Sequence, residues 1–172
     1  KMVLPTAGKI YTIRTATSST ADGRAANAPV YAVNNGFGTG IRYMAPNQSG
    51  ADSVKVDDHY GYNWLVESGD AANQTVRLKN MGTGRYMDLQ NQLNANVTLS
   101  DTARDIQLSS AYDVNSGAMN IKVGTDKYLN TGAAGRIVAY NGDIKAGLNN
   151  GAFTMAESAL STDGTFVAVT KG

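Results

Sequence analysis

The chain has 172 residues, 42% of them hydrophobic, and a formal net charge of +1 at pH 7. This length suits one domain with its own core, and the composition excludes an intrinsically disordered chain. No apolar run is long enough for a membrane-spanning helix, and Lys and Arg are scattered, so we expect neither membrane insertion nor a nucleic-acid partner. The chain contains no cysteine, which excludes disulfides, thiol catalysis and cysteine-bound metals.

Turn-forming and β-favouring residues dominate the composition. The chain has 19 Gly and many Asn and Asp, but only two Glu. Val, Ile, Thr and Tyr recur in short alternating runs, and no window shows the apolar spacing of an amphipathic helix. The sequence therefore predicts an all-β fold in a single domain, residues 1–172.

The first predicted strand covers residues 11–14, and a long insertion, residues 15–37, follows it. Within the insertion, residues 29–33 are apolar and suit an extra hairpin strand. A phrase at residues 38–44 then combines a Gly turn, a basic residue, a tyrosine and a large aliphatic residue, and predicts the second strand of the first repeat. The third and fourth strands are predicted at residues 54–56 and 63–66.

The same order of features returns twice along the chain. The phrase recurs at residues 82–87 and 124–129, and its tyrosines, Tyr43, Tyr86 and Tyr128, lie 43 and 42 residues apart. A regular period of this length indicates a repeat architecture. Strands flank the later phrases at residues 76–79, 97–99, 106–108, 119–122, 137–140 and 152–155. We expect repeats at about 8–68, 72–113 and 116–158, and a C-terminal extension, 159–172, with a surplus strand at 166–169.

One four-stranded unit cannot bury its apolar face alone. Three units around an axis can do so, and closure of a barrel also removes exposed strand edges. Residues predicted to point inward are Ile13, Tyr43, Val54, Trp64, Leu78, Tyr86, Val97, Ile106, Ile121, Tyr128, Ile137 and Phe153.

The order of strand, Gly turn, Tyr-aliphatic pair, strand and aromatic-bearing strand resembles the ricin-type β-trefoil over residues 8–158. The Gly-x-Tyr-Leu style is also similar to that of fascin-like trefoils. Residues 5–13 resemble the start of trefoil domains in secreted proteins of Bacteroides-type bacteria. The resemblance implies a β-trefoil of three four-stranded repeats, with an insertion in repeat one and an extra C-terminal strand, and a secreted or cell-surface bacterial location.

In ricin-type lectins, a shallow sugar pocket uses an Asp after the second-strand aliphatic residue, an aromatic platform, and an Asn or Gln further on. Carried onto this chain, the resemblance places the Asp of one site at Asp88, where Asn91 or Gln92 could supply the amide. It implies a second site at Asn130 with Asn150 and with Tyr140 or Asn141. Ala45 stands at the Asp position of the first repeat, so no site is expected there. The alternative is that Asp88 and Asn130 are turn residues whose side chains hold their loops.

Two further clusters suggest other chemistry. Asp57, Asp58 and His59 carry possible ligands for a metal ion, but a solvated turn explains them better, and we expect no metal and no cofactor. Glu67 and Glu157 match a glycosidase pair on paper. They close the fourth strands of two repeats, which favours a structural role.

These features predict a non-catalytic carbohydrate-binding module, lectin-like and not an enzyme by itself, in an exported protein. Its partners would be a carbohydrate ligand and other domains of a larger chain. The alternatives are a structural or protein-interaction β-trefoil without a sugar site and, third, a small glycoside hydrolase.

Overall fold

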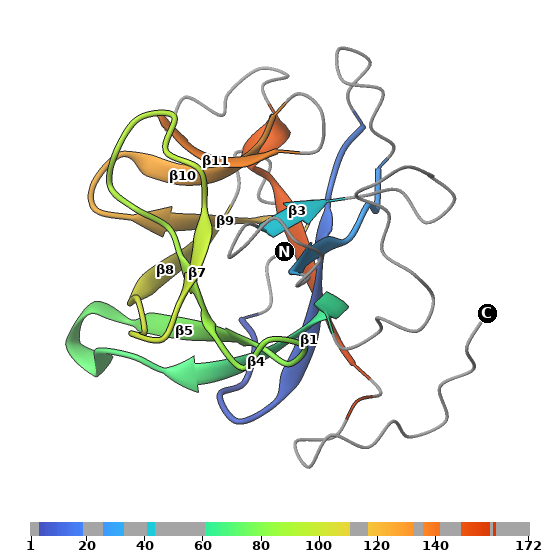
Figure 1. Ribbon diagram of the computed structural model, residues 1–172, viewed down its shortest axis with the longest axis vertical. Coiled ribbons are helices and arrows are strands. Elements are labelled where there is room, and N and C mark those ends of the chain that lie inside the picture. Colours follow the sequence, from blue (N-terminus) through green and yellow to red (C-terminus); the bar gives the residue numbers. More distant parts are fainter. Residues whose placement is uncertain are drawn as a thin grey trace.

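The computed structural model describes residues 4–18, 26–32, 41–43, 61–110, 117–132, 136–141, 149–158 and 160. Within these ranges the chain forms twelve strands and two short 3-10 helices (Figure 1). The strands are β1 (Ile10–Thr15), β2 (Val30–Ala32), β3 (Ile41–Tyr43), β4 (Asn63–Ser68), β5 (Thr75–Asn80), β6 (Tyr86–Asp88), β7 (Thr98–Ser100), β8 (Ile106–Ser110), β9 (Met119–Val123), β10 (Lys127–Thr131), β11 (Ile137–Asn141) and β12 (Phe153–Glu157). The helices are η2 (Ala71–Asn73) and η4 (Asn149–Gly151). None of the described helices has the length and apolarity to cross a bilayer.

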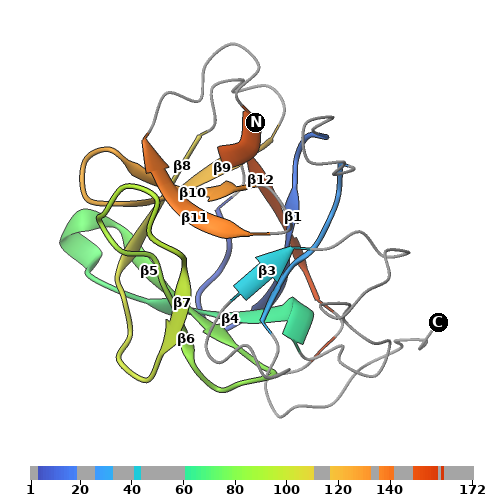
Figure 2. The same ribbon diagram turned by 45° about the horizontal axis from the view of Figure 1, so that its top comes forward.

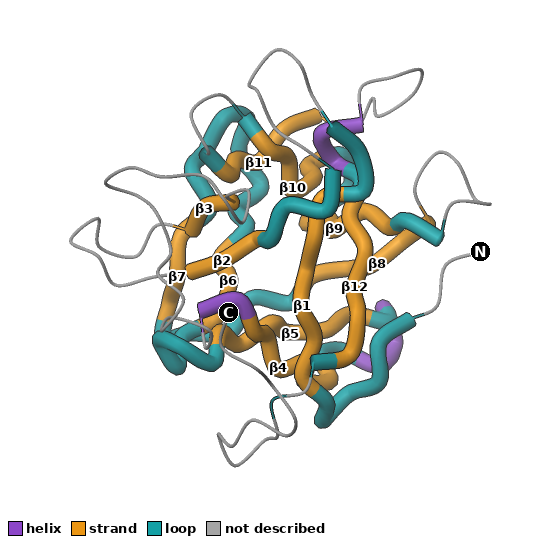
Figure 3. The backbone as a smooth tube through the Cα atoms, turned by 90° about the vertical axis from the view of Figure 1, so that its right-hand side faces the viewer, coloured by secondary structure: helices purple, strands orange, loops and turns teal. Residues whose placement is uncertain are grey.

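Six of the strands close into a ring. Each of β1, β4, β5, β8, β9 and β12 pairs antiparallel with the next, and β12 pairs back with β1. Figure 3 shows β1 and β12 side by side, with β4 and β5 at their lower end. The ring consists of the first and fourth strands of three successive groups, β1–β4, β5–β8 and β9–β12, which explains why one four-stranded unit needs the other two.

The second and third strands of each group form a hairpin outside the ring. The hairpins are β2–β3, β6–β7 and β10–β11, and Figure 2 shows the last of these beside β7. The all-β prediction is therefore confirmed. Every strand predicted within the described residues overlaps an observed one, from the first strand of the chain to the strand that begins at Phe153.

The structure corrects the strand order in the first group. The sequence predicted the phrase at residues 38–44 as its second strand and residues 29–33 as an extra hairpin strand. Instead, β2 (Val30–Ala32) is the second strand and pairs with β3 (Ile41–Tyr43), with Val30 opposite Tyr43. Tyr43 thus lies on a third strand, whereas Tyr86 and Tyr128 lie on second strands. The predicted strands at residues 54–56 and 166–169 lie outside the described residues.

The core fills the inside of the ring. Eight residues predicted to point inward are at most 1% exposed: Ile13, Trp64, Leu78, Val97, Ile106, Ile121, Ile137 and Phe153. The prediction was wrong for Tyr86 and Tyr128, which are only half-buried. Successive side chains of a strand face opposite sides, so Met87 and Leu129 enter the core in their place. Val54 and the side chain of Tyr43 lie outside the described residues.

Candidate functional site

The outer face of the β10–β11 hairpin carries the first wall of the candidate site. Leu129 lies opposite Ala139, and both are in the core. One residue along, Asn130 lies opposite Val138, and Tyr128 lies opposite Tyr140. Because opposite residues of an antiparallel pair share a face and faces alternate, Asn130, Val138 and Tyr140 all belong to the outer face.

Two other segments border this face. The loop between β6 and β7 runs along the free edge of β11, where the Asn94 amide donates to the Ala139 carbonyl at 2.8 Å. The Ala139 amide in turn donates to the Ala95 carbonyl at 2.9 Å. On the other side η4, which carries Asn150, contacts β10. The site therefore lies between the second and third strand groups.

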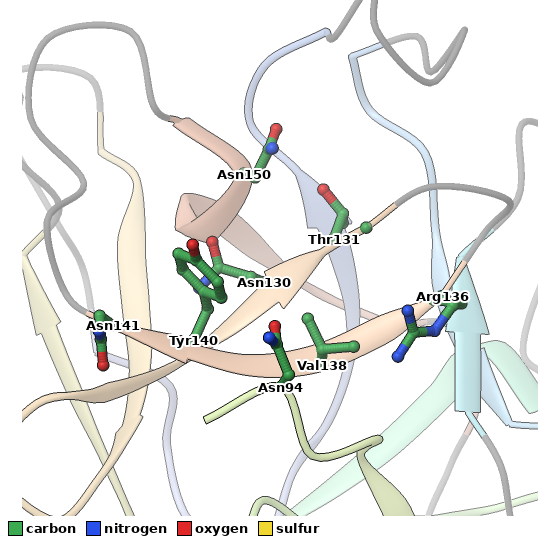
Figure 4. A pocket seen from close by; sticks show the side chains of 9 residues that line it. Asn94, Asn130, Thr131, Arg136, Val138, Tyr140, Asn141 and Asn150 are labelled. Atoms are coloured by element: carbon green, nitrogen blue, oxygen red, sulfur yellow. The ribbon is translucent and has the colours of Figure 1, made fainter. Parts of the chain in front are cut away.

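Together these segments enclose a pocket of about 340 Å³. Figure 4 shows Tyr140, Asn130 and Asn150 near one end and Arg136 at the other, with Asn94 and Val138 between them. This volume is at the lower end of the roughly 300–1,000 Å³ typical of small-ligand pockets. The described lining residues are Asn94, Asn130, Thr131, Gly132, Arg136, Val138, Tyr140, Asn141 and Asn150. They include four amide side chains and no carboxylate.

The side chains of the pocket differ in exposure and in how many of their polar atoms already have a hydrogen-bond partner. Asn130 is 8% exposed, and its Nδ2 donates to the Tyr128 carbonyl at 3.2 Å. Its Oδ1 has no hydrogen-bond partner in the part of the chain that the structure describes. Tyr140, by contrast, is 48% exposed, one of three large hydrophobic side chains that are exposed among the described residues. An aromatic ring this exposed beside several amide side chains is typical of a ligand-binding surface.

Thr131 is a wall residue of the pocket. It is 3% exposed and lies opposite Ile137, on the core side of the hairpin. Its Oγ1 is the buried side-chain oxygen that lacks a hydrogen-bond partner within the described ranges. The hydroxyl therefore borders the pocket without offering a surface to a ligand.

The structure thus brings three of the five predicted site residues together, Asn130, Tyr140 and Asn150. Sequence reasoning missed Asn94 and Arg136. Arg136 could have been found, because it precedes Tyr140 by four residues and shares its face at period two. Asn94 could not, because it comes from a different strand group and reaches β11 only through the closed fold.

Asp88 lies in a separate concavity of about 520 Å³ in the second group. Its Oδ1 accepts a hydrogen bond from Arg104 Nε at 2.9 Å, and next to it Arg77 Nε donates to Asp105 Oδ1 at 2.7 Å. The bond to Asp105 raises the pKa of Arg77. The carboxylate of Asp88 is therefore already paired within the protein.

Asn91 lines neither of these two pockets. It lies against Gly124 in the turn between β9 and β10, where a Cβ on Gly124 would come within 2.7 Å of Asn91 Nδ2. Gly124 also has a positive φ of 65°, which suits glycine. The structure places Asn91 as a packing partner of this turn.

Glu67 and Glu157, which matched a glycosidase pair in the sequence, each contact another residue of the protein. The Tyr86 hydroxyl donates to Glu67 Oε1 at 2.7 Å, and Lys9 Nζ lies 3.4 Å from Glu157 Oε1. Neither glutamate lines the two pockets described above. Among the described residues no cluster of His, Asp and Glu is arranged to hold a metal ion, and Asp57, Asp58 and His59 lie outside those residues.

No protein-family model and no curated protein sequence matches this chain. Solved structures do resemble it. The Rhizoctonia solani agglutinin aligns with a TM-score of 0.64 at 15% identity, over 92% of this chain and 99% of the agglutinin. A ricin B-like lectin from Macrolepiota procera, in complex with lactose, aligns with a TM-score of 0.63 at 11% identity, over 90% of this chain and 99% of the lectin. An α-L-arabinofuranosidase of family GH54 aligns with a TM-score of 0.63 at 14% identity, over 91% of this chain but only 32% of the enzyme.

These similarities confirm the fold. The six-stranded ring, its three outer hairpins and the likeness to ricin B-like lectins define a β-trefoil. At identities of 11–15% the likeness concerns the fold. A fold does not determine a ligand, because binding depends on the residues of the individual site.

Proposed function

We propose that this protein is a non-catalytic, lectin-like carbohydrate-binding module, and that the pocket on the β10–β11 hairpin is its sugar site. The single observation that carries the proposal is the meeting of the exposed Tyr140 ring with Asn130, Asn94 and Asn150 in one pocket. These residues come from two strand groups and three separate segments of the chain. Turn formation alone does not require them to converge.

The chemistry of the pocket suits a sugar. A pyranose ring has an apolar face of C–H groups, which can lie on the Tyr140 ring. Its hydroxyls are both donors and acceptors, and an amide side chain also offers both. The free Oδ1 of Asn130 is placed to accept a hydrogen bond from such a hydroxyl.

Similar structures support the proposal. The Macrolepiota procera lectin of the same fold was solved with lactose, and a Polyporus squamosus lectin was solved with a sialylated trisaccharide epitope. The fold also occurs as about a third of an arabinofuranosidase. We therefore propose that the module acts either alone or within a larger chain.

We further propose that the three strand groups are repeats at about 8–68, 72–113 and 116–158, with an insertion in the first repeat and an extra C-terminal strand. Only the third repeat keeps a working site, because the Asp88 carboxylate of the second is paired with Arg104.

The protein is proposed to be secreted or to lie on a bacterial cell surface, because residues 5–13 resemble the start of trefoil domains in secreted proteins of Bacteroides-type bacteria. Immunoblotting of culture medium and cell fractions tests this, and recovery only from the cytosol would contradict it.

A glycan array tests the proposed function. We expect the wild-type protein to bind at least one glycan class, and Tyr140→Ala to weaken that binding about tenfold, since loss of an aromatic contact removes roughly 1 kcal/mol or more. Leu93→Ala is the matched control, because Leu93 is also 48% exposed but does not line the pocket.

Asp88→Ala should leave binding unchanged. Absence of binding to every glycan at millimolar concentration would favour the alternative, a structural or protein-interaction trefoil. The glycoside hydrolase alternative would require turnover that disappears in Glu67→Gln or Glu157→Gln.

A further inference from the structure

The charge of the pocket distinguishes it from a site for neutral sugars. Among the described residues that line it, Arg136 is the one charged side chain. At the Tyr140 end of the pocket, Asn130 contributes an amide and not a carboxylate (Figure 4). A carboxylate there would repel an anionic ligand, whereas an amide does not.

Arg136 also differs from the arginines of the second group. Arg77, Arg85 and Arg104 each bond a carboxylate, Asp105, Asp101 and Asp88 respectively. Arg136 instead donates from Nη2 and Nε to the neutral Oδ1 of Asn96, at 2.7 and 3.3 Å. Within the described residues no carboxylate neutralises its guanidinium.

The contact with Asn96 orients Arg136 without cancelling its charge. Two N–H groups are directed at the amide oxygen, and Nη1 makes no hydrogen bond in the described part of the protein. A guanidinium fixed in this way can bond an anionic oxygen with little further loss of side-chain freedom. Arg136 is exposed, so a ligand can reach it.

The distance along the strand sets the size of the ligand. Arg136 and Tyr140 are four residues apart in extended backbone, so their Cα atoms are separated by roughly 13 Å. Figure 4 shows the two side chains at opposite ends of the pocket. In a ligand that contacts both side chains, the ring stacked on Tyr140 and the group bound by Arg136 would therefore belong to neighbouring sugars of one oligosaccharide.

We propose that the pocket binds an anionic oligosaccharide, with a sugar on Tyr140 and a carboxylate or sulfate group of a neighbouring sugar on Arg136. This inference rests on the proposed function and narrows its ligand class. Carboxylate and sulfate share the chemistry that Arg136 recognises, namely anionic oxygens in a fork geometry.

The test uses three versions of one glycan core. Lactose, 3′-sulfolactose and 3′-sialyllactose provide a neutral, a sulfated and a carboxylated ligand, and an array supplies matched sets on other cores if lactose is not recognised. We expect the charged version of the recognised core to bind at least about ten times more tightly than the neutral one. Raising NaCl from 50 to 500 mM should weaken the charged version severalfold and leave the neutral one nearly unchanged.

Arg136→Gln should remove the preference for the charged glycan. Both versions should then bind with the weaker affinity that the wild-type protein shows for the neutral core. Arg85→Gln, which changes an arginine outside the pocket, is the matched control and should keep the preference. Equal binding of neutral and charged versions, or a preference that survives Arg136→Gln, would overturn the inference and leave the proposed function standing. No binding of any glycan, or binding indifferent to Tyr140→Ala, would overturn the proposed function itself.

Discussion

At the scale of single residues, several polar side chains of this trefoil have identifiable partners. The clearest is Tyr86, whose hydroxyl donates to Glu67. This hydrogen bond is the largest of the effects that raise the pKa of Tyr86 above its ordinary value of 10.0, and loss of hydration and the charge of Glu67 add to it. Arg77 acts in the opposite direction.

The raised pKa of Tyr86 predicts a loss of stability at alkaline pH. Because the pKa is higher in the folded than in the unfolded protein, its contribution is complete below about pH 10 and decreases as pH rises through the folded value. We expect Tyr86→Phe to lower the free energy of unfolding at pH 8 by at most about 1 kcal/mol, since the group is partly exposed. Urea unfolding at pH 8 and pH 11 measures this, and a difference between variant and wild type that grows with pH would contradict it.

Thr131 is the opposite case, a buried hydroxyl without a partner in the described structure. Burial of an unpaired polar group costs free energy, and valine has nearly the same shape as threonine. We expect Thr131→Val to raise the free energy of unfolding by about 1 kcal/mol and to leave glycan binding unchanged. Thermal unfolding and glycan titration of the same sample measure both, and a destabilised variant would show that the hydroxyl is satisfied in solution.

At the scale of elements, buried asparagines connect strands to their turns. Asn80, at the end of β5, is 0% exposed. Its Nδ2 donates to the Gly61 carbonyl, and its Oδ1 accepts hydrogen bonds from the amides of Gly82 and Thr83. One side chain thus fixes the turn that leads into β6 and joins it to the start of the β4 region.

Removal of this side chain should be costly. Asn80→Ala leaves one carbonyl and two amides without their partner, and we expect a loss of about 2–4 kcal/mol in the free energy of unfolding. Asn73→Ala is the control, because Asn73 is exposed and its amide bonds only Asp70 nearby. Chemical unfolding of the two variants should differ clearly, and equal losses would contradict this role of Asn80.

The elements also show where sequence reasoning succeeds and where it stops. Strand positions followed from alternation, since buried positions such as Leu78 and Ile121 recur at period two. The order in the first group did not, because the phrase around Tyr43 looks like those around Tyr86 and Tyr128. Only the strand pairing distinguishes them. It places Tyr43 on the third strand of its group, opposite Val30 on the second strand. The sequence also predicted Tyr86 and Tyr128 to point inward, whereas Met87 and Leu129, one residue along, are the buried side chains.

At the scale of the whole molecule, closure of the ring creates the candidate site. The loop at Asn94 and the strand at Tyr140 are far apart in sequence, and they meet because the second and third groups are neighbours around the barrel. A resemblance carried residue by residue could therefore suggest Asn130, Tyr140 and Asn150, which all belong to the third strand group. It could not suggest Asn94, which belongs to the second strand group, nor show that Asp88 is paired with Arg104.

The central claim, that the sugar site is the pocket on the β10–β11 hairpin, is tested most directly by NMR. Amide shifts of the protein should be followed during titration with the glycan that binds best on the array. We predict that the perturbed amides lie at residues 94–96, 130–132, 136–141 and 149–151, which border the pocket, while those around Asp88 and Arg104 stay unchanged. Perturbations centred on Asp88, or on no surface in common with this pocket, would contradict the account.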